Sequence, residues 1–145
     1  MKKLFVGVLC VALSLSVQGK EVNMTSPDGK YQFTLSDSGG QLHYSLTWNG
    51  KQTVKPSLLG INANVEWRDG VEIGTVDSSR KDTIWHPVYG ERSEIKDCYH
   101  AWKIVVNRQN GRDKLILDVR AYDEGIAFRY HFPGAVSYTH LTLPT

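Results

Sequence analysis

Short segments in which apolar and polar residues alternate, separated by turn-forming residues, make up most of the chain after residue 20. Residues 41–48 show the clearest alternation, with Leu42, Tyr44, Leu46 and Trp48 on one side. Such a two-residue period is typical of a strand with one buried face. Because helical periodicity is almost absent and turn signals recur about every ten residues, the pattern predicts an all-β, antiparallel sandwich.

The same reasoning places the other strands and turns. Asn49-Gly50 has the residues of a type I′ turn, which fits the twist of two paired strands. Residues 56–61 break the alternation and predict a loop that tucks leucines under a sheet edge, whereas residues 62–79 predict irregular structure because their apolar positions are scattered. The predicted strands are 21–25, 30–35, 41–48, 83–89, 99–107, 114–122 and 126–132, and the last three form a meander.

The first 19 residues have the pattern of a secretory signal peptide. Two lysines precede an uncharged, mostly apolar run at residues 4–17, which is shorter than the roughly 20 apolar residues that span a bilayer. Val17 and Gly19 occupy the −3 and −1 positions of a cleavage site before Lys20. We therefore expect export to the periplasm or the extracellular space, with no membrane segment after cleavage.

Charge and cysteine content exclude several classes of function. The chain has 17 Lys and Arg against 15 Asp and Glu, and cleavage of the signal peptide removes two lysines and leaves no net charge. With no basic run, nucleic-acid binding is not expected. Cys10 falls in the signal peptide, so Cys98 is the only cysteine of the mature chain and no internal disulfide can form.

Motifs that carry chemistry are scarce. The sequence has no CxxC, HExxH, EF-hand, phosphate-binding or nucleophile-elbow pattern, and its five histidines are dispersed. Paired carboxylates would suit glycoside hydrolysis, and in a strand Glu91 and Asp97 would share a face, with Glu94 pointing away. The interleaved Arg92 and Lys96 favour a solvated strand edge over a catalytic pair. We expect no catalytic residue and no metal ligand.

The tryptophans allow two interpretations. On one sheet face they would form a platform for stacking sugars, as in a free-standing carbohydrate-binding module. In a domain without disulfides, large aromatic side chains more often fill the core, and that is the arrangement we expect. The four residues are Trp48, Trp67, Trp85 and Trp102.

Three blocks of sequence, in order, carry a family resemblance. Residues 26–44 with 56–60 contain Ser-Pro-Asp-Gly-Lys and Pro-Ser-Leu-Leu-Gly, residues 85–99 contain Gly-Glu-Arg, and residues 120–130 read Arg-Ala-Tyr-Asp-Glu-Gly-Ile-Ala-Phe-Arg-Tyr. Together they resemble the amino-terminal domain of glycoside hydrolase family 97. The resemblance singles out a set of residues that we expect to be structural or to contact a catalytic barrel: Trp85, Gly90, Glu91, Arg92, Tyr99, Arg120, Tyr122, Asp123, Gly125, Phe128 and Arg129.

The resemblance implies the opening part of an exported α-glycosidase, either inverting and α-glucosidase-like or retaining and α-galactosidase-like. Such enzymes begin with a β-super-sandwich, followed by a (β/α)₈ barrel that supplies the catalytic carboxylates, and they hold an active-site calcium ion. Most of the calcium ligands lie beyond the matched region. Residues 20–135 are therefore expected to be an incomplete, non-catalytic sandwich that packs in cis against the barrel and holds no cofactor, while the carbohydrate substrate belongs to the parent enzyme.

Two parts of this interpretation concern the carboxyl-terminal end. Residues 123–125 are expected to make a tight reversal, which would bring Arg120 and Arg129 close together across the strand ladder, near Asp118 and the carboxylates of the turn. Residues 136–145 depart from the family pattern and are expected to be a tail foreign to it.

A purely structural exported β domain is a third possible function, beside the glycosidase domain and the binding module.

Overall fold

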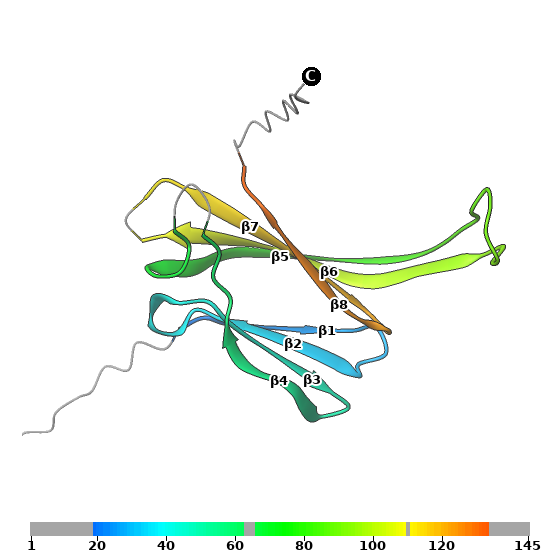
Figure 1. Cartoon of the computed structure of the whole chain (residues 1–145), viewed down its shortest axis with the longest axis horizontal. Coiled ribbons are helices and arrows are strands. Elements are labelled where there is room, and N and C mark those ends of the chain that lie inside the picture. The colour runs from blue at the N-terminus through cyan, green and yellow to red at the C-terminus, as the bar shows by residue number, and fades with distance from the viewer. Residues whose placement is uncertain (1–18, 63–65, 110, 134–145) are drawn as a thin grey trace, which may run out of the picture.

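The computed structural model describes residues 19–62, 66–109 and 111–133, which form two four-stranded antiparallel sheets (Figure 1). The first sheet contains β1 (Glu21–Thr25), β2 (Tyr31–Ser36), β3 (His43–Trp48) and β4 (Lys51–Leu58), with the short 3₁₀ helix η1 (Ser38–Gly40) between β2 and β3. The second sheet contains β5 (Val71–Trp85), β6 (Ile95–Arg108), β7 (Lys114–Tyr122) and β8 (Gly125–His131). The predicted all-β antiparallel sandwich is confirmed.

Two expectations fall outside the described residues: almost all of the signal peptide, and the foreign tail 136–145. Within the residues that the structure covers, no helix is long and apolar enough to cross a membrane.

The core lies between the facing sides of the two sheets. Alternation along β7 buries Leu115, Leu117 and Val119 and turns the residues between them outward, as the two-residue period requires. From the first sheet, Phe33 and Leu35 of β2 enter the same core. Each such side chain contributes about 1.5–3 kcal/mol by leaving water, so this apolar layer is what holds the sheets together.

The turn and loop between β3 and residue 61 match the prediction only in part. Asn49 and Gly50 both have positive φ, 49° and 74°, as a type I′ turn demands. The predicted loop at residues 56–61 is wrong at its start, because β4 continues to Leu58 and includes Pro56. Proline is tolerated there because β4 is an edge strand and its residues need not all donate to a neighbour.

The prediction of irregular structure for residues 62–79 is also wrong, because β5 begins at Val71. Val71 and Ile73 are buried, but the register against β6 shifts between Ile73 and Val76. This bulge moves the next inward residue by one position and so breaks the two-residue period on which the prediction depended.

The β5–β6 hairpin is longer than the other strands and projects beyond the sandwich (Figure 1). Its outer half has no opposing sheet, so polar residues occupy both faces of β5 from residue 77 to residue 83. Residues 86–94 close the hairpin, and among them Val88 and Tyr89 are almost fully exposed. The family-like block at residues 85–99 therefore forms a protruding arm.

Candidate functional site

The side of the second sheet that faces away from the first sheet, here called the outer face, collects several of the residues that the resemblance singled out. The strand alternation that points Val119 and Ile104 into the core points their neighbours outward. Pairing of β5 with β6, β6 with β7 and β7 with β8 then brings the outward residues into adjacent rows. The five family-like residues on this face are Trp85, Tyr99, Arg120, Tyr122 and Arg129.

A stack of aromatic and basic side chains occupies the centre of the outer face. The guanidinium carbon of Arg120 lies 4.7 Å from the ring centroid of Tyr99, and the Lys81 ammonium lies 5.8 Å from the same centroid. The rings of Tyr99 and Tyr122 are 5.0 Å apart. A hydrogen bond with Tyr122 raises the pKa of Arg120, so this group keeps its charge. Tyr99 is buried although it points away from the core, because these neighbours cover it.

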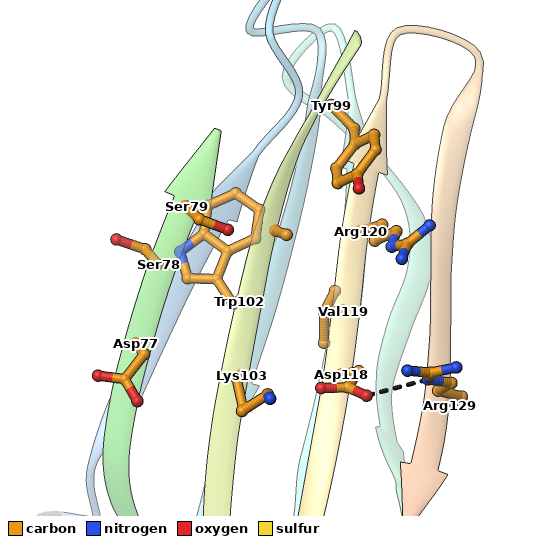
Figure 2. A pocket seen from close by; sticks show the side chains of 11 residues that line it. Asp77, Ser78, Ser79, Tyr99, Trp102, Lys103, Asp118, Val119, Arg120 and Arg129 are labelled. Carbon is orange, nitrogen blue, oxygen red and sulfur yellow. Dashed lines mark hydrogen bonds and ion pairs between the residues drawn. The ribbon is translucent and has the colours of Figure 1, made fainter. Parts of the chain in front are cut away.

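Arg129 is paired with one of the carboxylates that the sequence suggested. Its Nε donates to Asp118 Oδ2 over 2.9 Å, and the register places these two residues directly opposite each other (Figure 2). Arg120 lies opposite Ala127 instead. Arg120 and Arg129 are therefore diagonal neighbours rather than a directly opposed pair, and both line the groove described below. The reversal is tighter than assumed, because Tyr122 already pairs with Gly125.

An open groove of about 430 Å³ runs along the outer face (Figure 2). Side chains of both charge signs line it, from Asp77 on β5 to Arg129 on β8, with Lys103, Asp118 and Arg120 between them. Groups of this kind can form hydrogen bonds and ion pairs with a polar surface. In the part of the chain that the structure describes, no three His, Cys, Asp or Glu side chains gather as metal ligands. The calcium ion expected for the parent enzyme stays a prediction.

The acidic residues of the arm do not form the pair considered from the sequence. Glu91 lies in the loop at residues 86–94, where strand alternation does not apply, so the prediction that it shares a strand face with Asp97 is wrong. Asp97 accepts a hydrogen bond from the Lys81 ammonium at 2.7 Å. Gly90 and Arg92 belong to the same exposed loop, and Gly90 has a φ of 135°.

Phe128 and Gly125 have structural roles. Phe128 points toward the core side, with its ring centroid 6.1 Å from that of Phe33 and 6.2 Å from that of Tyr44. It is 40% exposed because β8 is the edge strand of its sheet. Gly125 opens β8 at the tight turn, as expected.

Asp123 joins the first and third blocks of the family resemblance. Its Oδ1 accepts a hydrogen bond from the backbone N–H of Asp28 at 2.9 Å, which ties the β7–β8 turn to the β1–β2 turn at the same end of the molecule (Figure 1). Asp28 in turn accepts hydrogen bonds from Ser26 Oγ at 2.6 Å and from the Lys30 ammonium, 2.8 Å away. Asp123 therefore has a structural role that depends on residues 95 positions away.

The contacts of Asp28 predict a loss of stability in acid. Hydrogen bonds from Lys30 and Ser26 hold the pKa of Asp28 well below its ordinary value of 3.8. A depressed pKa means that the ionised carboxylate stabilises the fold at neutral pH and that this contribution is lost as pH falls below 3.8. We expect Asp28→Asn to lower the urea midpoint at pH 7, and the gap to wild type to shrink at pH 3.

Lys30→Gln is the control for this experiment, because Lys30 is the largest cause of the shift. It should reduce the difference between pH 7 and pH 3. A gap between wild type and Asp28→Asn that stayed constant from pH 7 to pH 3 would contradict the assignment.

The tryptophans do not form a single platform. Trp67 is buried and Trp102 packs against the core, as expected, but Trp48 and Trp85 are each about half exposed, at 47% and 50%. The core prediction is wrong for these two residues. Trp48 ends β3 of the first sheet and Trp85 ends β5 of the second, so they lie on different sheets. The sugar-stacking alternative gains no support from this arrangement.

Some contacts of the site were not identified from the sequence. Lys81, which contacts both Tyr99 and Asp97, lies in a polar stretch that resembles any solvated strand. Only the register of β5 against β6, which places Lys81 opposite Tyr99, reveals its role.

Known proteins similar to the chain have one family in common. The sequence model of the Glycosyl-hydrolase 97 N-terminal family matches residues 24–143. A retaining alpha-galactosidase of Bacteroides thetaiotaomicron is 31% identical over 134 residues, which are 90% of this chain and 19% of that protein. The chain thus spans about a fifth of the length of this relative.

Solved structures show the same likeness in three dimensions. A glycoside hydrolase family 97 enzyme from Pseudoalteromonas sp. strain K8, in complex with panose, has a TM-score of 0.72 at 23% identity, over 77% of this chain and 17% of that chain. A beta-arabinopyranosidase has a TM-score of 0.71 at 24% identity, over 77% and 18% of the two chains. At these identities the likeness shows the fold alone.

The match to the family's sequence model extends into residues 136–143, so the boundary of the foreign tail stays a prediction.

Proposed function

The chain belongs to glycoside hydrolase family 97, whose N-terminal domain it matches, and we propose that it is the non-catalytic opening domain of an exported α-glycosidase. One observation carries the proposal: the family match covers most of this chain, while the chain covers 19% of its α-galactosidase relative. The remaining four fifths of such a protein have room for a catalytic barrel. The parent enzyme would act on α-glucosides or α-galactosides.

The contacts of the family-like residues favour a structural role over a catalytic one. Asp123 joins two turns, Phe128 fills the edge of the core, and Arg129 is paired with Asp118. None of these three side chains is left free to transfer a proton or to attack a substrate. The outer face, with its exposed arginines and groove, is the surface that we propose for packing against the barrel in cis.

Export and calcium are further parts of the proposal. The charged start and apolar run of the first 19 residues support export to the periplasm or beyond. The calcium ion would be bound by the catalytic part of the parent enzyme, as the family resemblance implies.

The test compares this chain with the intact protein from the same gene. We expect the intact protein to hydrolyse a nitrophenyl α-glucoside or α-galactoside, and the 145-residue chain to show no hydrolysis above buffer. Reduced activity of the intact protein after treatment with EGTA, restored by added calcium, would support the metal assignment.

Two results would contradict the proposal. Hydrolysis by the purified 145-residue chain would mean that catalysis occurs within it. An intact protein that is inactive on both substrates, combined with calorimetric binding of maltooligosaccharides by the chain, would favour the carbohydrate-binding module instead.

A further inference from the structure

The carboxylate of Asp37 is a buried charge at the junction of the two sheets. Asp37 follows β2, and only 9% of the residue is exposed. One oxygen, Oδ2, accepts a hydrogen bond from the backbone N–H of Ile73 at 2.7 Å. The other, Oδ1, accepts one from the backbone N–H of Lys20 at 2.5 Å. No lysine, arginine or histidine side chain forms a salt bridge with Asp37 among the residues described. A buried carboxylate held only by neutral donors lacks the positive partner that such a charge normally has.

Lys20 is held in place by three separate hydrogen bonds, two of them with Asp37. Besides its N–H, its carbonyl oxygen accepts from the Asp37 backbone N–H at 3.1 Å, and its ammonium donates to the Gly74 carbonyl at 2.5 Å. The backbone nitrogen of Lys20 is therefore held at one defined place beside the carboxylate.

Gly19 lies so close to Asp37 that the site accepts no side chain before Lys20. A Cβ atom built on Gly19 would lie 2.8 Å from Asp37 Oδ1 and 2.8 Å from the backbone nitrogen of Ser38. An open cavity of about 400 Å³ adjoins the same point and is lined by Gly19, Lys20, Asp37 and Glu72, among others. The cavity gives water access to the Gly19–Lys20 peptide bond.

We propose that Asp37 is the binding site for the new amino terminus that forms when the chain is cut between Gly19 and Lys20. Hydrolysis of that peptide bond consumes one water, the Gly19 carboxylate leaves with residues 1–19, and the Lys20 amine takes up a proton. The amide N–H beside Asp37 Oδ1 thereby becomes an α-ammonium group, and the buried carboxylate gains its counter-charge. This inference rests on the export part of the proposed function, but not on the proposed enzyme activity.

The consequence is that processing strengthens the fold. A charge-assisted hydrogen bond is roughly twice as strong as a neutral one, and an ammonium has donors left over for water in the cavity. Besides Asp37, the charged groups around the new terminus are the Lys20 ammonium, which is bonded to Gly74, and Glu72, which lines the cavity. Glu72 is the one other carboxylate that could compete for the new terminus in the described lining of this cavity.

The experiment compares three forms of the exported protein by thermal unfolding: the chain that starts at Lys20, the same chain acetylated on its α-amine, and the chain that retains Gly19. We expect the form that starts at Lys20 to melt about 4 °C or more above the other two. Asp37→Asn should abolish this difference, whereas Glu72→Gln should leave it unchanged. Sequencing of the exported protein should give Lys20 as its first residue.

Several outcomes would overturn the inference. These are a mature terminus other than Lys20, equal melting temperatures of the free and acetylated forms, or a difference that Glu72→Gln removes. If Asp37→Asn does not fold, the melting temperatures of the free and acetylated wild-type chains still test whether the new α-ammonium group stabilises the fold. Loss of glycosidase activity in the intact protein would bear on the proposed function alone, because the melting comparison does not involve a substrate.

Discussion

Replacing Phe33 with alanine is expected to lower the free energy of unfolding by about 3–5 kcal/mol, the range for truncating a buried phenylalanine. Phe33 is 2% exposed and lies where β2 of the first sheet meets β8 of the second. Its ring stacks on Tyr44 at 5.8 Å and contacts Phe128 at 6.1 Å. Removing it leaves a cavity between the sheets that neither aromatic neighbour can fill. Urea unfolding followed by circular dichroism measures the loss.

Two further variants make the Phe33 result interpretable. Phe33→Leu keeps most of the volume and should cost about 1–2 kcal/mol, so it gives a folded reference if the alanine variant unfolds. Gln32→Ala removes a side chain from the next residue, which is exposed on the opposite face, and should change the free energy by about 0.5 kcal/mol or less. A loss of less than 1 kcal/mol for Phe33→Ala would show that the sheets do not meet at this ring.

The strands that alternate cleanly could be predicted from the sequence. The bounds of β1 and β7 agree with the predicted ranges 21–25 and 114–122, and β8 begins one residue earlier than expected. In β7 every second residue is buried from Leu115 to Ala121, so the sequence pattern and the burial pattern coincide. Where one face of a strand contacts a core and the other contacts water, alternation is a sufficient signal.

Prediction failed where that condition does not hold. β5 has a bulge after Ile73, and toward its outer end it has no opposing sheet, so its apolar positions follow no regular period. The half-exposed Trp48 and Trp85 were assigned to the core on residue type alone. Trp48 stands at a strand end, where the opposing sheet no longer covers it, whereas Trp85 lies at the end of β5 on the outer face, which points away from the opposing sheet.

Contacts between distant segments were the least predictable part of the site. The sequence placed carboxylates near Arg129, and Asp118 is indeed its partner, because the two lie on neighbouring strands of one hairpin. The bond from Asp28 to Asp123 spans 95 positions and links the two sheets, so no local pattern could indicate it. The family resemblance identified both segments as important, but only the fold shows that they touch.

Trp67→Ala is expected to cost about 3–5 kcal/mol, whereas the same substitution at the half-exposed Trp48 or Trp85 should cost roughly half as much. Trp67 is 1% exposed and lies in the connection that carries the chain from the first sheet to the second. Its ring packs 6.2 Å from that of Phe132, and its backbone N–H donates to the Ile61 carbonyl at 3.0 Å. The ring therefore fixes this crossing connection against the core.

The three tryptophan variants are matched controls for one another, because each removes the same side chain and differs only in burial. Urea midpoints give the losses, and tryptophan fluorescence gives an independent check. Trp67→Ala should remove the component that emits at the shortest wavelength, since that ring lies away from water, whereas Trp48→Ala and Trp85→Ala should remove longer-wavelength emission. Equal losses of stability at the three positions would contradict this prediction. They would mean that the burial of Trp67 adds nothing to stability and that the crossing connection does not depend on its ring.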